Sequence, residues 1–190
     1  GWALHTLGRI AAQRANYAQA QALYEQGRQI SQELGDRQLE SALFNSLSLL
    51  AHQVGDDGAA LEYAREALRI VEAIAEPVDM GYALTNLGHA LAGLGRLDEA
   101  ADAYRQAVEV RHQLGQHNLA TEPQAGLARI TLAQGQVTQA QLHVEEILHC
   151  LESGSLDGVE EALRVCLTCY QVLAAAHDPR ADGLLSRARK

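Results

Sequence analysis

The sequence has few of the residues that interrupt helices or build sheets. It contains only three prolines among 190 residues, and aromatic side chains make up 4% of the chain. Valine, isoleucine and threonine do not form the runs that a β-sheet protein needs. Alanine and leucine dominate instead, together with glutamate, glutamine and arginine, which favour helices. The composition therefore predicts an all-α protein.

Clustered positive charge is also missing. The formal net charge is −9, and the only lysine is the last residue, Lys190. A nucleic-acid-binding protein normally carries a basic patch, so we expect no nucleic acid partner. No run of about eighteen apolar residues is present, and no segment has the pattern of a signal peptide, so we expect no membrane association.

The cysteine content and the first residues give two further expectations. Three cysteines, Cys150, Cys166 and Cys169, are an odd number, which favours a reducing cytoplasm over a disulfide framework. The chain starts with Gly1 and Trp2, already within a helical pattern. We therefore expect a cytoplasmic fragment of a longer protein.

The most informative feature is an internal repeat with a step of forty residues. Leucine and alanine recur at equivalent positions: Leu7, Leu47, Leu87 and Leu127, and Ala20, Ala60, Ala100 and Ala140. The units cover about 1–40, 41–80, 81–120 and 121–158, and a degenerate fifth unit covers 159–190. We expect them to form one domain, because no unit can bury its apolar faces alone.

Each unit is predicted to contain two helices, because its apolar residues follow a helical spacing. The first helices are expected at 3–14, 42–54, 81–94, 122–134 and 159–175. The second helices are expected at 17–34, 57–75, 97–114, 137–152 and 179–189. Thr121 with Gln124, and Asp157 with Glu160, have the capping-box pattern that marks a helix start.

Small residues mark the points where the two helices of a unit are predicted to cross. They are Gly8, Ser48, Gly88, Ala128 and Cys169 on the first helices, opposite Ala20, Ala60, Ala100, Ala140 and Ala181 on the second. Such pairs allow the helix axes to approach to about 8 Å.

One copy of the repeat is especially clear. It runs Tyr-Ala-Leu-Thr-Asn-Leu-Gly from Tyr82 to Gly88, continues through Gly95-Arg-Leu-Asp-Glu-Ala100, and ends with Tyr104 and Ala107. This pattern resembles the tetratricopeptide repeat family, and the resemblance covers nearly the whole chain. The forty-residue unit is similar to the repeats of kinesin light chains and of bacterial regulators of the maltose-activator type. The family's large aromatic residue in the first helix is replaced here by Leu4, Phe44, Leu84 and Gln124. The resemblance implies a right-handed α-solenoid whose first helices line a concave, partner-binding face.

No pattern of catalytic or metal-binding residues emerges from the sequence. Cys166 and Cys169 lie three apart in a predicted helix, where both sulfurs share one face and behave as small apolar groups. A zinc site would need a second pair of ligands at matching spacing. His112, His117 and His143 are expected on a solvated face. We therefore predict no enzyme activity, no metal and no cofactor.

Charge separates the two sets of predicted helices. The first helices of units one to three contain no aspartate or glutamate, which predicts a neutral or mildly basic inner face. Greater exposure of the second helices would explain the same pattern. The residues predicted to line a binding groove are Trp2, His5, Arg9, Gln13, Asn45, Leu49, His52, Tyr82, Thr85, Asn86, His89, Glu122, Ala125 and Arg129. The asparagines are suited to a peptide backbone, and Arg9 and Arg129 to carboxylates.

The sequence therefore predicts a protein- or peptide-binding repeat scaffold. The resemblance to bacterial regulator repeats suggests the sensor or interaction segment of a larger regulatory protein. Two alternatives stay open: the repeats regulate a catalytic domain outside this sequence, or they associate with themselves as a homo-oligomer.

Overall fold

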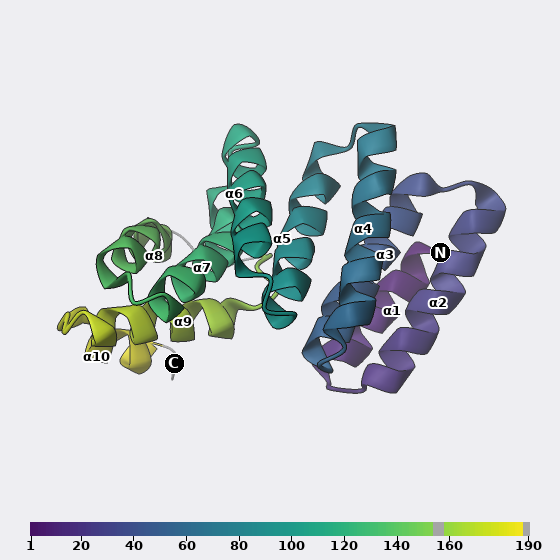
Figure 1. Cartoon of the computed structure of the whole chain (residues 1–190). Helices are drawn as coiled ribbons and strands as arrows, with labels where there is room; N and C mark the ends of the chain where they lie inside the picture. The colour runs from purple at the N-terminus through teal and green to yellow at the C-terminus, as the bar shows by residue number, and fades with distance from the viewer. Residues whose placement is uncertain (154–157, 188–190) are drawn as a thin grey trace. The chain divides into compact units, whose positions relative to one another are not determined.

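The computed structural model of the chain describes residues 1–153 and 158–187. These residues form ten helices and no strand (Figure 1). The helices are α1 (Trp2–Gln13), α2 (Tyr17–Leu34), α3 (Arg37–Gln53), α4 (Asp57–Ile74), α5 (Pro77–Gly93), α6 (Leu97–Gln113), α7 (His117–Ala133), α8 (Val137–Ser153), α9 (Ala162–Ala175) and α10 (Arg180–Arg187). The predicted all-α class, built from repeated helix pairs, is confirmed.

The chain divides into two compact units, Gly1–Ala103 and Tyr104–Lys190. The N-terminal unit contains α1 to α5 and the beginning of α6. The C-terminal unit contains the rest of α6 and α7 to α10. The expectation of a single domain stays a prediction.

The N-terminal unit is a stack of helix pairs. α1 packs on α2 and α3 on α4, while α1, α3 and α5 are neighbours through the α1–α3 and α3–α5 contacts (Figure 1). Its core includes Tyr24, Leu39, Leu43 and Leu47, which form a single apolar cluster. The apolar stripe of each helix is therefore buried against the next pair, as the repeat pattern predicts.

The C-terminal unit is built in the same way. α7 packs on α8, α9 packs on α10, and α7 contacts α9. Val144, Ile147, Val165 and Cys169 belong to its core, and Cys169 has no exposed surface. The predicted packing role of Cys169 is confirmed, whereas Cys166 is half-buried.

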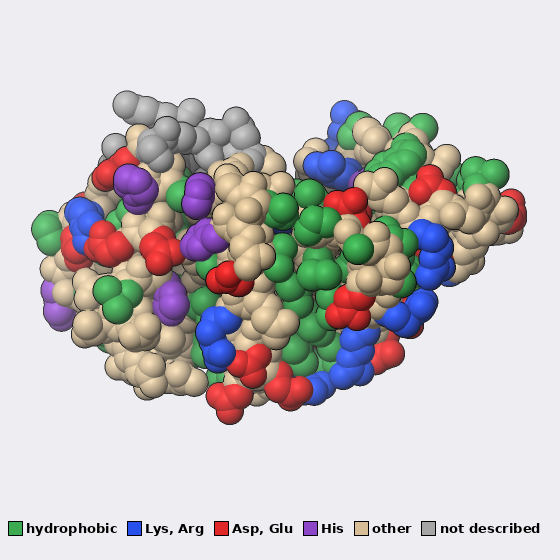
Figure 2. Space-filling view, turned by 90° about the horizontal axis from the view of Figure 1, so that it is seen from above, with side chains coloured by type: hydrophobic (Ala, Val, Ile, Leu, Met, Phe, Trp, Pro, Cys, Tyr) green, Lys and Arg blue, Asp and Glu red, His purple; other side chains and the backbone are tan. Residues whose placement is uncertain are grey.

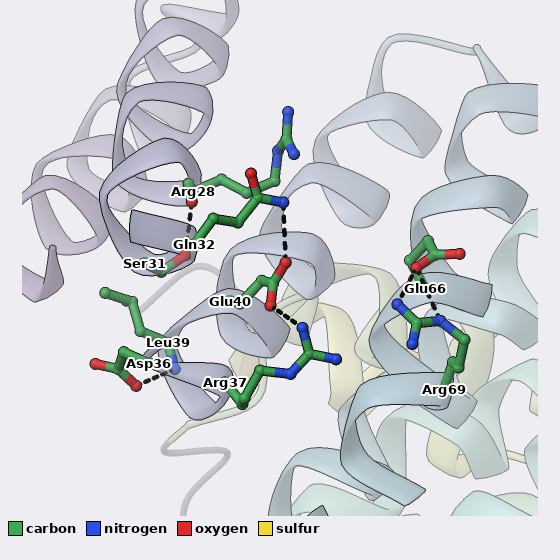
Figure 3. A network of polar contacts seen from close by, with 9 residues as sticks. All are labelled: Arg28, Ser31, Gln32, Asp36, Arg37, Leu39, Glu40, Glu66 and Arg69. Atoms are coloured by element: carbon green, nitrogen blue, oxygen red, sulfur yellow. Dashed lines mark hydrogen bonds and ion pairs between the residues drawn. The ribbon is translucent and has the colours of Figure 1, made fainter. Parts of the chain in front are cut away.

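The second helices match their predicted ranges closely, but three first helices begin earlier than predicted. α3 begins at Arg37, α5 at Pro77 and α7 at His117, four or five residues before the expected positions 42, 81 and 122. The residues expected in connecting loops instead form N-caps and the first turns of these helices. Asp36, for example, accepts a hydrogen bond from the Leu39 backbone N–H at 3.0 Å (Figure 3).

The capping-box prediction at Thr121 is wrong. Thr121 lies inside α7, and its hydroxyl donates to the backbone carbonyl of Asn118 at 2.6 Å. Pro123 makes a helix start near Thr121 plausible from the sequence, because proline is common in the first turn of a helix. Here Pro123 is buried in the helix interior, where packing outweighs the lost hydrogen bond to the Leu119 carbonyl. The second capping box includes Asp157, which lies outside the described residues.

The predicted crossing points are buried, and one is marked by a direct contact. The hydroxyl of Ser48 in α3 donates to the Ala60 carbonyl in α4 at 2.8 Å. At the equivalent position in α1, Gly8 leaves room for the buried ring of Tyr24. Small residues therefore admit either a hydrogen bond or an aromatic ring between the helices of a pair.

Candidate partner-binding surface on the first helices

The sequence-predicted site residues lie on the first helix of each pair. We call this the first-helix surface: in the N-terminal unit it is formed by α1, α3 and α5, and in the C-terminal unit by α7 and α9. The two parts are described separately.

Polar contacts repeat along the first-helix surface of the N-terminal unit. His5 Nε2 in α1 lies 2.9 Å from Ser46 Oγ in α3, and Asn86 Nδ2 in α5 donates to the Asn45 carbonyl in α3 at 3.1 Å. Both contacts join residues 41 positions apart. The repeat therefore reproduces one helix-to-helix contact with different side chains.

These contacts limit which predicted residues are accessible. Asn45, Thr85, Asn86 and His89 are all buried. The Thr85 hydroxyl donates to the Gly81 carbonyl at 2.8 Å, and the amide of Asn86 is already engaged with α3. Asn45 Oδ1, in contrast, has no hydrogen-bond partner among the described residues.

Two histidines and an aspartate form a second polar group in the N-terminal unit. His52 Nδ1 in α3 lies 2.6 Å from Asp57 Oδ1 in α4. The ring of His52 stacks on that of His89 in α5, with centroids 5.4 Å apart and planes 9° from parallel. His52 and His89 were both among the predicted groove residues, whereas Asp57 was not.

The accessible part of this surface is concentrated on α1. Trp2, Arg9 and Gln13 are exposed, while His5 is half-buried. Burial, with the nearby Arg9 guanidinium, lowers the pKa of His5. Leu49 in α3 and Tyr82 in α5 are also half-buried.

The predicted absence of acids from the first three of these helices is wrong. Because α3 and α5 begin earlier than predicted, α3 includes Glu40 and α5 includes Asp79. Glu40 is buried and accepts hydrogen bonds from Gln32 at 3.0 Å and from Arg37 at 2.6 Å (Figure 3). Its charge is thus balanced within the junction of α2 and α3.

In the C-terminal unit, Arg129 of α7 is the predicted site residue with the most distinctive environment. Its Nη1 donates to Thr168 Oγ1 of α9 at 3.2 Å, and the guanidinium also bonds the Tyr104 hydroxyl. Burial lowers the pKa of Arg129 and raises that of Tyr104 to about 12. Among the described residues, no carboxylate is ion-paired with Arg129. Arg129 is half-buried, and the nearby Glu161 carboxylate opposes the lowering of its pKa.

Two other predicted groove residues of α7 are buried. Ala125 is fully covered, and Glu122 is buried with its Oε2 accepting from the Glu160 backbone N–H at 3.3 Å. Burial and the neighbouring Glu161 carboxylate raise the pKa of Glu122 to about 7. Glu122 therefore carries only part of a negative charge at neutral pH.

Sequence reasoning missed two accessible leucines in α9. Leu163 and Leu167 are 77% and 51% exposed. They follow the buried Glu122 and Gly126 by 41 residues, so they occupy the same face of the first helix in the last pair. The sequence does show Leu163 and Leu167 as an apolar pair four residues apart. Their equivalence to Glu122 and Gly126 was missed because the step into the fifth unit is 41 residues and not 40.

Three further histidines of the C-terminal unit were predicted to lie on a solvated face. His112 and His117 are exposed, as predicted, and their ring centroids are 5.3 Å apart. His143 is half-buried, in contrast to the prediction, and burial lowers its pKa. Histidine side chains gather beside acidic ones on part of the face shown in Figure 2.

Comparison with known proteins identifies the repeat. The model of the family described as tetratricopeptide repeat matches residues 1–73 and 79–153. The chain belongs to the tetratricopeptide repeat family. No curated protein matches it. Among the described residues of this tetratricopeptide repeat protein, no helix has both the length and the apolar character to cross a membrane.

Two solved structures share the fold. One is BtubC (BKLC) from P. vanneervenii, with a TM-score of 0.76 and 19% identity over 98% of this chain and 77% of that chain. The other is a putative kinesin light chain from Podosopora anserina with nearly identical TPR-like repeats. It has a TM-score of 0.68 and 20% identity over 98% of this chain and 92% of that chain. The predicted resemblance to kinesin light chain repeats is thereby confirmed.

Proposed function

We propose that this protein binds a protein or peptide partner through its first-helix surface. The observation that carries the proposal is the tetratricopeptide repeat match over most of the chain, because these repeats are generally non-catalytic interaction scaffolds. We further propose that the chain is the sensor or interaction segment of a larger bacterial regulatory protein. This part of the proposal is based on the forty-residue repeat unit, which resembles the repeats of bacterial regulators.

The accessible residues suggest the chemistry of the partner. In the N-terminal unit, the exposed Arg9 and Gln13 share one face of α1 with the exposed indole of Trp2. In the C-terminal unit, the half-buried Arg129 of α7 contacts Thr168 of α9, the helix that exposes Leu163 and Leu167. Both units thus combine an arginine with apolar surface. We propose a partner segment that presents carboxylate and apolar side chains.

The buried residues have a supporting role in this proposal. Asn45, Thr85, Asn86 and His89 are all buried. The Asn86–Asn45 hydrogen bond and the stacking of His89 on His52 connect α5 to α3. His5, Leu49, His52 and Tyr82 are half-buried and form the floor of the surface. Because these side chains are already ordered in the free protein, they lose little conformational entropy when a partner binds.

A displayed library of ten-residue peptides, selected on the purified chain, would identify a ligand for titration calorimetry. We expect Arg9→Glu or Arg129→Gln to weaken binding by about 1.5–3 kcal/mol, because each removes a charge-assisted hydrogen bond. Arg65→Glu is a matched control, since Arg65 is exposed on the second helix α4 with Glu62 as its ion-pair partner. Equal weakening by Arg65→Glu, or full binding by both first-helix variants, would place the ligand elsewhere. Circular dichroism establishes that each variant is folded.

A further inference from the structure

The end of α6 and the start of α7 bring two histidines together on the surface of the C-terminal unit. His112 lies in the last turn of α6, and His117 is the first residue of α7. Both side chains are exposed, and their ring centroids are 5.3 Å apart. Two imidazoles bound to one tetrahedral zinc ion, at Zn–N distances of about 2.0–2.1 Å, have ring centroids about 5 Å apart. The two rings therefore have the separation that a shared zinc ion requires.

The turn between these histidines has a fixed backbone. The Gly115 N–H donates to the His112 carbonyl at 3.0 Å, and the Gln116 N–H donates to the Arg111 carbonyl at 2.8 Å. These bonds form a Schellman motif, and Gly115 has the left-handed φ of +68° that the motif requires. The buried Arg111 side chain also donates to Gln116 Oε1 at 2.6 Å. The backbone that carries both imidazoles is thus already ordered, which lowers the entropic cost of binding an ion between them.

A thiol from α8 lies close to His117. The Sγ atom of Cys150 is 3.6 Å from the His117 carbonyl oxygen, and Cys150 is not in a disulfide. Because the two residues are 33 positions apart, no short ligand spacing relates them, which is why the sequence predicted no metal here. Imidazole and thiolate ligands together favour zinc over calcium or magnesium, which prefer oxygen ligands.

We propose that His112, His117 and Cys150 bind one zinc ion, with water at the fourth position. Burial and the Glu146 carboxylate raise the pKa of Cys150, so its thiol is protonated without metal. When zinc binds, the thiol turns from the His117 carbonyl to the ion, the S–H bond breaks, and the proton passes to solvent as the Zn–S bond forms. The ion then connects α6, α7 and α8. This proposal does not rest on the proposed partner-binding function.

Titration of the reduced, metal-free chain with zinc chloride in a calorimeter tests the site. We expect one equivalent to bind, and His112→Ala or His117→Ala to weaken binding by at least about tenfold, because loss of even an outer-shell partner costs about 10–100-fold. His177→Asn is the matched control, since His177 is an exposed histidine of the same unit with a left-handed backbone that asparagine tolerates. Equal zinc affinity in the parent and all three variants would overturn the proposal.

Cobalt(II) in place of zinc tests the thiolate ligand. A thiolate bound to cobalt gives a charge-transfer absorption in the near ultraviolet, which histidine ligands alone do not give. We expect this absorption in the parent chain and in Cys166→Ser, whose substituted thiol is half-buried in α9 of the same unit, and its loss in Cys150→Ser. Its absence from the parent chain, or its persistence in Cys150→Ser, would overturn the assignment of Cys150 as a ligand.

Discussion

Replacing Gly8 by alanine tests whether the first helix pair is held at close approach. A Cβ atom at Gly8 would lie 2.6 Å from Cδ1 of Tyr24, far inside normal contact distance. The Tyr24 ring is 2% exposed and belongs to the apolar cluster of the N-terminal unit, so it has little room to move. Overpacking of this kind costs about 1–3 kcal/mol. Alanine gains about 1 kcal/mol of helix propensity over glycine, which offsets part of that loss.

The control for this substitution is Gly58→Ala in α4. A Cβ there meets only Asp56 Oδ1 at 3.6 Å, an ordinary contact, so the propensity gain should appear as stabilisation. We expect Gly8→Ala to be less stable than Gly58→Ala by about 1–3 kcal/mol in urea unfolding followed by circular dichroism. Amide hydrogen exchange should increase mainly in α1 and α2, because damage in a repeat array stays near its origin. Equal stabilisation by the two substitutions would refute the close approach of Gly8 and Tyr24.

Two further predictions concern buried titratable groups of the C-terminal unit. Cys169 should react with a thiol reagent more slowly than Cys150, because burial raises the pKa of Cys169 to about 12 and the side chain is fully covered; faster labelling of Cys169 would contradict its core position. The pKa of Glu122 is raised from 4.5 to about 7, so its protonated form contributes stability that is complete below about pH 4.5 and is lost as the pH rises through about 7. Urea midpoints at pH 6 and pH 8 should therefore differ less in Glu122→Gln than in the parent chain, and an unchanged difference would contradict the assignment.

The helix pairs could be predicted from sequence because two independent periods agree. The helical spacing of apolar residues and the forty-residue step both place a leucine at positions 7, 47, 87 and 127. The starts of α3, α5 and α7 could not be predicted as well, because Asp36 and Pro77 are compatible with either a loop or a helix start. Which residue becomes the N-cap of each helix depends on where the preceding helix ends.

The candidate surface was predicted only in part. A one-face spacing identifies which residues share a side of a helix, and it selected Arg9, which is exposed, as well as His52 and His89, whose rings stack. It does not reveal how closely the next helix approaches. Asn86 therefore looked like a ligand-binding amide, although it donates to the Asn45 carbonyl and is buried between α3 and α5.

One repeat position can serve different purposes along the chain because its surroundings change. The position occupied by Arg9 in α1 corresponds to Leu49, His89 and Arg129 in the later first helices. Arg9 is exposed, His89 is buried against His52, and Arg129 is bound by the hydroxyls of Thr168 and Tyr104. The repeat thus sets where the backbone places each side chain, while neighbouring residues set its charge and access. Recognition in this protein should therefore depend on the side chains that differ between the units, such as the exposed Arg9, and not on the repeat pattern that all the helices share.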